Sequence, residues 1–561
     1  MNKKLFLSLL VGSAVVLTGC NKKIAQFDSN YFSATPTPLE VLGDQVPGTV
    51  TGKIPAKIFV KKAEVTVTPS LCYDGKEVAS QSYTYQGEKV RGNNQVISYD
   101  NGGYITIPVS YNYEPNMEDA TLVLDFAVKQ GKKQYVLPRV TVAKGVNTTA
   151  TIAEVATTAP AIATDKFQRI INEKFSADIK FLINQANIRK GELSSSSMQD
   201  FNQKLAHASA DSTRKIKEIN ISSYASPEGG VEFNTKLAEK REKNTSSYLE
   251  KHLNDANISN FGELTAQFTA QDWEGFQSLV SKSSIQDKDL ILSVLSMYKD
   301  PEVREKEIRN MSSVFDQLAE DILPQLRYSR LTATVDVIGK SDQQIQEAFA
   351  KNPKSLSCDE LLYCATLTND NAKKIEIYQT TANIYSNDYR AFNNLAACQF
   401  EAGDYNAASA NLKKAISLNP SSGEANMNLG LISMLNGDYS KANEQLGNAG
   451  GIDASNEALG VYHLKMGDNA AAAKAFGEAK SNNAALAQIL NKDYSKAKRT
   501  LAAITTPDAT TYYLMAILGA RTNNEQMVIS NLRQASKLDS SLKDKALKDQ
   551  EFANFNLSSL L

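Results

Sequence analysis

The sequence predicts a multidomain chain with an N-terminal antiparallel β-sandwich, a central α/β domain that carries a helical insert, and a C-terminal all-α solenoid. Three observations predict this fold class. The 561 residues are too many for a single hydrophobic core, since domains usually hold roughly 100 to 200 residues. Short runs of alternating polarity fill residues 54–152, and a Gly-Asp-Tyr tripeptide recurs in the C-terminal third at Gly403 and Gly437.

The first residues read as a leader. Lys3 and Lys4 precede an apolar run from Leu5 to Leu17, which is shorter than the ~20 residues that a membrane span needs. The run ends in Leu17-Thr18-Gly19-Cys20, which resembles the lipobox of bacterial lipoproteins. The resemblance implies a signal peptide over 1–19, cleavage before Cys20 and acylation of Cys20. The alternative is an ordinary signal peptide with a chance cysteine.

The cysteine and the residues after it indicate where in the cell envelope the protein is placed. Two or three acyl chains on one residue anchor a protein stably where a single chain does not. Asn21, Lys22 and Lys23 stand where surface-exported lipoproteins of Bacteroidota usually carry acidic residues. We therefore expect an outer-membrane lipoprotein that faces the periplasm. The lipid is the only covalent group expected, and no other cofactor is predicted.

A tether and a β-sandwich are expected next. Residues 20–45 are rich in Pro, Ser, Thr and Asn without a period, which is typical of a tether. Over 46–155, Val65 and Val67 alternate with polar neighbours as in a strand that has one face in a core. Gly residues in dipeptides such as Asp74-Gly75 supply turns between the runs. A Thr- and Ala-rich connector, residues 147–163, leads into the central domain.

The central domain is organised around the stretch Ile219 to Leu249. A strand of alternating residues is followed by a polar turn containing Pro227, Gly229 and Gly230, and then by a helix. Leu237 and Arg241 lie four residues apart and therefore share one face of this helix. A strand, a tight polar turn and a helix in this order indicate a ligand site at the turn.

This stretch resembles the OmpA-like domain that grips peptidoglycan. Asn234, Leu237 and Arg241 match that family's signature, whereas Ser226 stands where the family has an Asp. The resemblance implies a domain over 163–340 in which Arg241 holds the carboxylate of diaminopimelate, with Ser226 and Asn234 beside it. Glu228 could take over the ammonium group. The alternative is that Arg241 forms an ion pair that the fold kept after binding was lost.

A helical insert, residues 271–325, interrupts this domain before its last strand. The insert and the turn sequence Ala-Ser-Pro-Glu-Gly resemble the variant of the domain found in outer-membrane proteins of Bacteroidota. The Ser at the Asp position would then belong to a subfamily.

The final third, residues 350–545, resembles tetratricopeptide repeats. The motif at Gly403-Asp404-Tyr405 recurs at Gly437-Asp438-Tyr439, with small and large residues at the spacing of such repeats. About six helical pairs are expected to form a solenoid with a concave groove. Four amides on first helices are predicted to bind the backbone of a partner: Asn393, Asn394, Asn426 and Asn428. The alternative is a solenoid that only packs on its own neighbouring domains.

Composition narrows the function classes. The net charge of -1 disfavours nucleic acid as a partner, because phosphate binders show a basic excess. Three histidines and no CxxC pair give poor material for a metal site. Cys72, Cys358, Cys364 and Cys398 are expected to be buried thiols, with a disulfide among the last three left open. No nucleophile or phosphate-loop motif is present, although abundant Asp and Glu leave a glycosidase-like carboxylate pair open.

The expected function is therefore non-enzymatic. The chain is predicted to be an outer-membrane lipoprotein that acts as an adaptor in an envelope complex, for outer-membrane protein assembly or secretion, with a protein partner on the solenoid. The alternatives are an anchor that links the outer membrane to peptidoglycan and a scaffold for a surface fibre. The step to an envelope complex rests on analogy.

Overall fold

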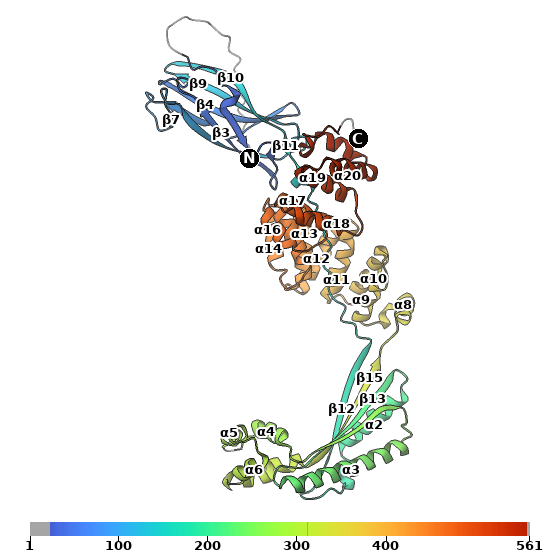
Figure 1. Cartoon of the computed structure of the whole chain (residues 1–561). Helices are drawn as coiled ribbons and strands as arrows, with labels where there is room; N and C mark the ends of the chain where they lie inside the picture. The colour runs from blue at the N-terminus through green and yellow to red at the C-terminus, as the bar shows by residue number, and fades with distance from the viewer. Residues whose placement is uncertain (1–22, 286, 311, 558–561) are drawn as a thin grey trace. The chain divides into compact units, whose positions relative to one another are not determined.

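The computed structural model describes residues 23–285, 287–310 and 312–557, which fall into two compact units (Figure 1). One unit contains the described residues up to Thr164 together with those from Thr368 onward, and the other spans Asp165–Leu367. The first unit is thus assembled from two stretches that are far apart in the sequence. The signal peptide expected over 1–19 and the lipidation expected at Cys20 lie outside the described residues.

The N-terminal part of the first unit is a β-domain of two sheets that share one core. One sheet has the order β1-β3-β8 and the other β10-β9-β4-β6-β7, with β5 paired to β4. Val50 and Ile107 of the smaller sheet and Val65 and Phe126 of the larger one belong to the same buried cluster. The strands are β1 (Phe32–Thr35), β2 (Leu39–Glu40), β3 (Gln45–Ile54), β4 (Ala63–Tyr73), β5 (Lys76–Ala79), β6 (Tyr83–Gly87), β7 (Gln95–Ile97), β8 (Gly103–Asn112), β9 (Thr121–Gln130), β10 (Lys133–Lys144) and β11 (Val146–Asn147).

The tether expected over 20–45 is wrong for its described part. Ile24, Phe27 and Phe32 are buried in the core of the β-domain. The rings of Phe27 and Phe126 lie 4.8 Å apart between centroids. These apolar residues are separated by turn-forming residues, which gives the segment the composition of a loop although it packs as part of the domain. The β-domain therefore begins before β1.

The second unit contains a four-stranded sheet in the order β12-β15-β13-β14. β13 and β14 are parallel, whereas the other two pairings are antiparallel. Ile219 and Ile221 of β13 share a core with Leu205 of α2 and Leu249 of α3, so both helices pack on one face of the sheet. The elements are β12 (Ile170–Lys180), α1 (Lys190–Leu193), α2 (Ser196–Ala210), β13 (Arg214–Tyr224), α3 (Val231–Asp255), β14 (Phe261–Thr269) and β15 (Tyr328–Ile338).

The helical insert expected over 271–325 corresponds to a small helical layer with its own core. Phe276, Val280, Ile291 and Leu318 are buried together there. The insert consists of α4 (Trp273–Lys282), α5 (Lys288–Met297), α6 (Pro301–Asn310), α7 (Ser312–Gln317) and two short turns over Leu318–Ile322 and Leu323–Leu326. After β15, the unit ends with α8 (Asp342–Lys351) and α9 (Cys358–Thr366).

The C-terminal part of the first unit is a run of helical hairpins that is consistent with a tetratricopeptide-like solenoid. The helices are α10 (Asn371–Ile384), α11 (Tyr389–Glu401), α12 (Tyr405–Leu418), α13 (Gly423–Leu435), α14 (Tyr439–Gly447), α15 (Ser455–Lys465), α16 (Asn469–Phe476), α17 (Asn482–Leu490), α18 (Tyr494–Ala502), α19 (Ala509–Arg521), α20 (Glu525–Leu538) and α21 (Ser541–Lys548), followed by a short turn over Gln550–Phe552. Helix α9 lies within the repeat region expected over 350–545 but falls in the other unit. Among the described residues, no helix combines the length and the apolar character needed to cross a bilayer.

The Gly-Asp-Tyr motif forms the turns of two hairpins, between α11 and α12 and between α13 and α14. Gly403 and Gly437 have φ of 78° and 73°, a conformation that glycine adopts without strain. Asp404 and Asp438 then accept hydrogen bonds from the main-chain N–H groups of Ala407 and Lys441 and so cap the second helix. The motif is thus a helix stop followed at once by a helix start.

Candidate functional site

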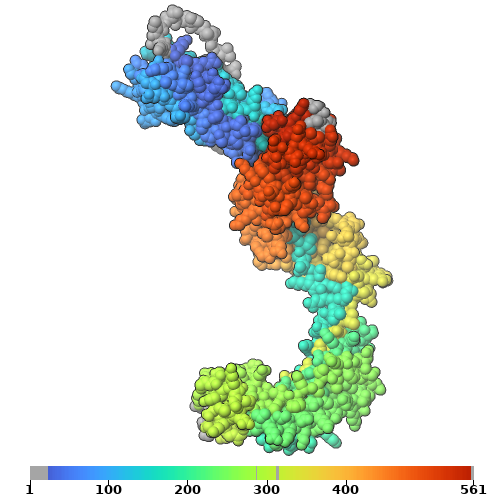
Figure 2. Space-filling model, viewed as in Figure 1, coloured from blue at the N-terminus to red at the C-terminus, as the bar shows by residue number. Residues whose placement is uncertain are grey.

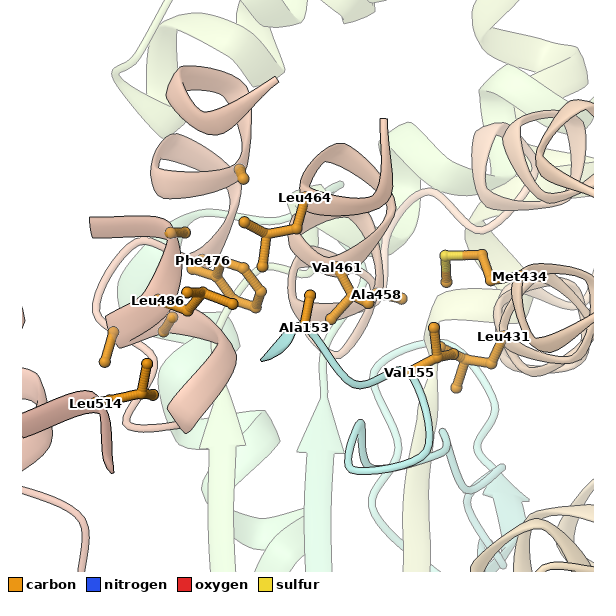
Figure 3. Packing of buried hydrophobic residues seen from close by; sticks show 14 of the residues in the cluster. Ala153, Val155, Leu431, Met434, Ala458, Val461, Leu464, Phe476, Leu486 and Leu514 are labelled. Atoms are coloured by element: carbon orange, nitrogen blue, oxygen red, sulfur yellow. The ribbon is translucent and has the colours of Figure 1, made fainter. Parts of the chain in front are cut away.

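The concave side of the solenoid holds the chain's own connector, residues 147–163. The first helices of successive hairpins, α11, α13, α15 and α17, adjoin one another and line this side. Ala153, Val155 and Ala161 of the connector belong to the buried cluster of the solenoid. Figure 3 shows Ala153 and Val155 among apolar side chains of the first helices, including those labelled Leu431, Ala458 and Val461.

Three of the predicted amides bind the main chain of this connector. Asn428 accepts from Ala161 N–H at 2.7 Å and donates to Ala161 C=O at 2.8 Å. Asn394 makes the same pair of bonds with Ala163, at 2.8 and 2.9 Å. Asn393 donates to Ala161 C=O at 3.0 Å. Asn394 and Asn428 thus each bind both the N–H and the C=O of one connector residue, as a neighbouring strand does in a sheet.

The three amides also bind one another. Asn428 Nδ2 donates to Asn393 Oδ1, and Asn393 Nδ2 donates to Asn394 Oδ1, both at 3.0 Å. All three side chains are at most 1% exposed. The connector both covers these amides and supplies their main-chain partners. The connector therefore completes the concave side of the solenoid.

The middle of the connector is held by residues that the sequence analysis did not identify. Asn483 accepts from Glu154 N–H at 3.0 Å and donates to Glu154 C=O at 2.7 Å. Lys465 Nζ donates to Ala153 C=O at 2.5 Å. Burial lowers the pKa of the Lys465 ammonium, and the nearby Glu154 carboxylate opposes this shift.

The spacing within the repeats explains which asparagines face the connector. Asn394, Asn428 and Asn483 each lie nine residues before the residue of positive φ in the turn of their hairpin, which is Gly403, Gly437 or Lys492. Equal spacing from the turn places the three amides at the same point on successive first helices. This spacing is the signal that could have found Asn483.

Asn426 does not belong to this set, and its assignment to the groove is wrong. Its amide donates to the carbonyls of Pro420 at 3.0 Å and Ser422 at 2.8 Å, at the start of its own helix. Asn426 lies two residues before Asn428, which turns its side chain by about 200° around a helix of 3.6 residues per turn. It therefore stabilises the start of α13 rather than binding the connector.

The start of the connector is tied to the C-terminus of the solenoid by a buried carboxylate. Glu551 accepts from Asn147 Nδ2 at 2.9 Å and from Thr149 Oγ1 at 2.6 Å, and it pairs with Arg521 at 2.5 Å. Burial acts to raise the pKa of Glu551, but the bonds and charge of Arg521, aided by Thr149 and Asn147, hold it below its usual value. Figure 2 shows the blue β-domain against the red C-terminal helices, where Gln550 donates to Glu118 C=O.

In the second unit, the turn between β13 and α3 forms a pocket of about 260 Å³. The pocket brings together all four residues predicted to bind peptidoglycan, which are Ser226, Glu228, Asn234 and Arg241. Exposed Ile183 lies at the same pocket. The other lining residues are Asn184, Gly229, Phe233 and Leu237.

Arg241 holds main-chain carbonyls rather than a carboxylate. Its guanidinium donates to Tyr224 C=O at 2.7 Å, Gln185 C=O at 3.0 Å and Leu182 C=O at 3.3 Å. The side chain is 1% exposed and lies 5.0 Å from the centroid of the Phe181 ring. Burial, together with the neighbouring Arg327, lowers the pKa of Arg241 to about 10. In the described part of the chain Arg241 forms no ion pair, so the alternative of a retained ion pair is wrong. The clamp on a ligand's carboxylate stays a prediction.

The remaining three residues organise the turn. Asn234 donates to the carbonyls of Ser226 and Gly229, both at 2.9 Å, and so fixes the backbone of the turn. Glu228 pairs with Arg327 at 2.9 Å, and Arg327 Nε reaches Ser226 Oγ at 3.4 Å. The second oxygen of Glu228, Oε2, is buried and has no hydrogen-bond partner in the described part of the chain.

Other candidate groups are dispersed. Cys364 and Cys398 are buried as expected, whereas Cys72 and Cys358 are only partly buried. Within residues 23–285, 287–310 and 312–557, no three His, Cys, Asp or Glu residues are grouped so that they could hold a metal ion.

No protein-family model and no curated protein matches the chain. Among solved structures, the chain is similar to a tetratricopeptide repeat protein from Parabacteroides merdae, with 13% identity and a TM-score of 0.29 over 36% of this chain and 88% of that one. It is also similar to pilF of Pseudomonas aeruginosa, with 17% identity and a TM-score of 0.29 over 38% and 99%. YrrB, a tetratricopeptide repeat protein with an unusual peptide-binding site, gives 16% identity and a TM-score of 0.20 over 37% and 100%. At such TM-scores these similarities carry no argument, and the fold description rests on the geometry above.

Proposed function

We propose that the chain is a non-enzymatic outer-membrane lipoprotein that serves as an adaptor in an envelope complex for outer-membrane protein assembly or secretion. The observation that supports this proposal is the connector on the concave side of the solenoid. Asn394 and Asn428 bind its main chain near the end and Asn483 binds it in the middle, so the β-domain and the solenoid are tied together within one unit. Such a unit can carry a partner at a fixed distance from the lipid at Cys20.

The connector also restricts where a protein partner binds. The amides of Asn393, Asn394 and Asn428 are already engaged by Ala161 and Ala163. A partner peptide could use them only by displacing the connector. We therefore place the partner on the outer side of the solenoid, which is formed by the second helices of the hairpins.

Affinity purification from detergent-solubilised envelope tests the adaptor role. The tagged chain is expected to recover a defined outer-membrane barrel protein. The variant Cys20→Ser, which lacks the acylation site, is the matched control and is expected to leave the membrane fraction. Recovery of muropeptides without any barrel protein would favour the anchor instead, and recovery of neither would contradict both roles.

A peptidoglycan anchor is the second candidate, and the pocket in the second unit supports it. Ser226, Glu228, Asn234 and Arg241 meet there as the resemblance to OmpA-like domains implies. Because Arg241 is engaged by carbonyls, we assign the ligand contact to the Glu228 side chain, which lines the pocket. A carboxylate oxygen of this kind suits the ammonium group of diaminopimelate.

Sedimentation with purified sacculi tests the anchor. Glu228→Gln removes the charge with little change in shape, and Glu232→Gln, at an exposed position on the same helix start, is the matched control. The anchor predicts that the wild type and Glu232→Gln sediment with sacculi while Glu228→Gln stays in the supernatant. Equal and poor sedimentation of all three would rule it out.

A further inference from the structure

The chain enters the β-domain at one defined end. Ile24 is 4% exposed, and its N–H donates to Tyr135 Oη at 3.2 Å. Tyr135 Oη in turn donates to Gln130 Oε1 at 3.2 Å. The ammonium of Lys23 lies 5.9 Å from the centroid of the Tyr135 ring. The first described residues are therefore fixed against the β9–β10 hairpin, a few residues after Cys20.

Several exposed lysines converge on the same end. In the larger sheet, Glu64 pairs with both Lys129 and Gln86, and Lys133 pairs with Gln130, so the start of β4 and the ends of β6 and β9 lie together. A hollow of about 470 Å³ lies among these segments and is lined by Lys62, Glu64, Lys89, Val90, Lys129, Gln130 and Gly131. We refer to Lys23, Lys62, Lys89, Lys129, Lys132 and Lys133 as the lysine-rich end.

Most of these charges are not neutralised within the protein. The nearby acids are engaged by three lysines. Glu64 pairs with Lys129 at 3.2 Å, and Asp100 pairs with Lys61 at 2.7 Å and also with Lys57. Glu88 also lies 3.6 Å from Lys61. Among the described residues, no carboxylate forms an ion pair with four members of the lysine-rich end: Lys62, Lys89, Lys132 and Lys133.

At the other end of the same strands, acidic side chains outnumber basic ones. Glu114, Glu118 and Asp119 precede β9, and Glu118 lies where Gln550 of the C-terminal segment contacts the β-domain. Basic side chains thus predominate at the first end and acidic ones at the other, where Lys76 pairs with Glu114, in a chain whose net charge is only -1. The lysine-rich end lies next to Lys23 and Ile24, where the described part of the chain begins.

We propose that the lysine-rich end docks on the anionic headgroups of a phospholipid bilayer. This inference rests on the proposed lipid anchor, because acyl chains on Cys20 would bring this end to the membrane surface. Each lysine close to an anionic bilayer strengthens binding by roughly fivefold, and the effect weakens with added salt. Such a second contact would hold the β-domain end-on, with the solenoid directed away from the bilayer.

Vesicle sedimentation of the mature chain tests the docking without any contribution from the lipid. The chain carries Cys20→Ser, so that acylation cannot occur. We expect it to bind vesicles of phosphatidylglycerol and phosphatidylcholine, to release them in high salt, and to leave pure phosphatidylcholine vesicles unbound. The combined change of Lys62, Lys89, Lys132 and Lys133 to Gln is expected to weaken binding at least about tenfold.

A matched control variant distinguishes the effect of the lysine-rich end from the effect of a lower net charge. It replaces four exposed solenoid lysines by Gln and loses the same charge: Lys413, Lys474, Lys498 and Lys537. This variant is expected to bind like its parent. Equal weakening in both variants, or failure of the parent to bind anionic vesicles, would overturn the proposal.

The lipid anchor is judged separately by labelling of Cys20 with radioactive palmitate in cells. Absence of the label would refute the anchor, whatever the vesicles show. Labelling together with no vesicle binding would refute only the lysine-rich end.

Discussion

The connector groove and the Arg241 pocket differ in what remains free to bind a ligand. In the groove, Asn394 and Asn428 satisfy both main-chain groups of Ala163 and Ala161, and the connector fills the concave side. In the pocket, Arg241 is equally buried and also binds main-chain carbonyls, yet about 260 Å³ stays open beside it. Both sites use their polar side chains to fold the chain, but only the pocket keeps room for a second molecule.

The comparison shows that a polar side chain at a ligand-like position can serve its own backbone. Asn and Arg are suited to extended peptide and to carbonyl clusters because they offer several donors in a fixed geometry. Such a side chain binds its own chain where a segment of that chain reaches the site, and it is otherwise open to another molecule. In the groove that segment is the connector, and in the pocket the Glu228 side chain lines the open space.

The largest effect is expected from removing the Arg241 guanidinium. Arg241→Met keeps much of the volume but leaves the carbonyls of Leu182, Gln185 and Tyr224 buried without this donor. We expect a loss of about 4 kcal/mol in the free energy of unfolding of this unit. This free energy is measured by urea unfolding, with the fluorescence of Trp273, the one tryptophan in the chain, as the signal.

Lys240→Met is the control for this variant, since Lys240 is the exposed neighbour on the same helix. It is expected to change stability by less than about 0.5 kcal/mol. Normal stability of Arg241→Met would mean that Arg241 is available for a ligand after all, and the two sites would then differ more than described above.

A smaller effect is expected from removing the groove amides. Changing Asn393, Asn394 and Asn428 together to Ala should weaken the docking of the connector by about 3 kcal/mol, at about 1 kcal/mol for each buried side chain. Cleavage of the connector by a nonspecific protease should then become roughly 100-fold faster. Mass spectrometry of the fragments locates the cut.

Asn426→Ala provides the matched control, because Asn426 binds only the start of its own helix. The connector should stay as resistant to the protease as in the wild type. If the triple variant is also resistant, the amides do not hold the connector, and the groove would be as free as the pocket.

The smallest effect concerns pH at the start of the connector. Because the pKa of Glu551 is lower in the folded chain than its usual 4.5, its contribution to stability is present above pH 4.5 and is lost as the pH falls below that value. Neighbouring Asp549 acts in the opposite sense, since burial raises its pKa. Glu551→Gln should cost about 1.5 kcal/mol near neutral pH and progressively less below pH 4.5.

Thermal unfolding of the wild type and Glu551→Gln at several pH values measures this difference. Asp549 is present in both proteins, but the charge of Glu551 contributes to its raised pKa, so the difference includes this coupling between the two carboxylates. A difference in stability that stays constant from neutral pH to well below pH 4.5 would contradict the role assigned to the charge of Glu551.

Local sequence patterns predicted the repeats and the turn of the second unit well. Gly403-Asp404 marks a helix stop and a helix start, and both signals depend only on neighbouring residues. The grouping of Ser226, Glu228, Asn234 and Arg241 in one pocket likewise follows from a strand, a turn and a helix in sequence. These features were predictable because short-range geometry determines them.

The path of the connector was not predictable in this way. Ala161 and Asn428 are far apart in the sequence, and no local period indicates that they meet. The small side chains of the connector suggested a linker, although the same small size lets an extended peptide lie against closely spaced helices. The burial of Phe27 in the expected tether has the same origin, since it depends on Phe126.

Hydrogen exchange of the unmodified chain tests the central claim most directly. The amides of Ala161 and Ala163 donate to Asn428 and Asn394 and are buried in the described structure. They should exchange as slowly as the amides in the middle of α11 and α13. Exchange of these two amides at the rate of an unstructured peptide would contradict the claim that the connector occupies the groove.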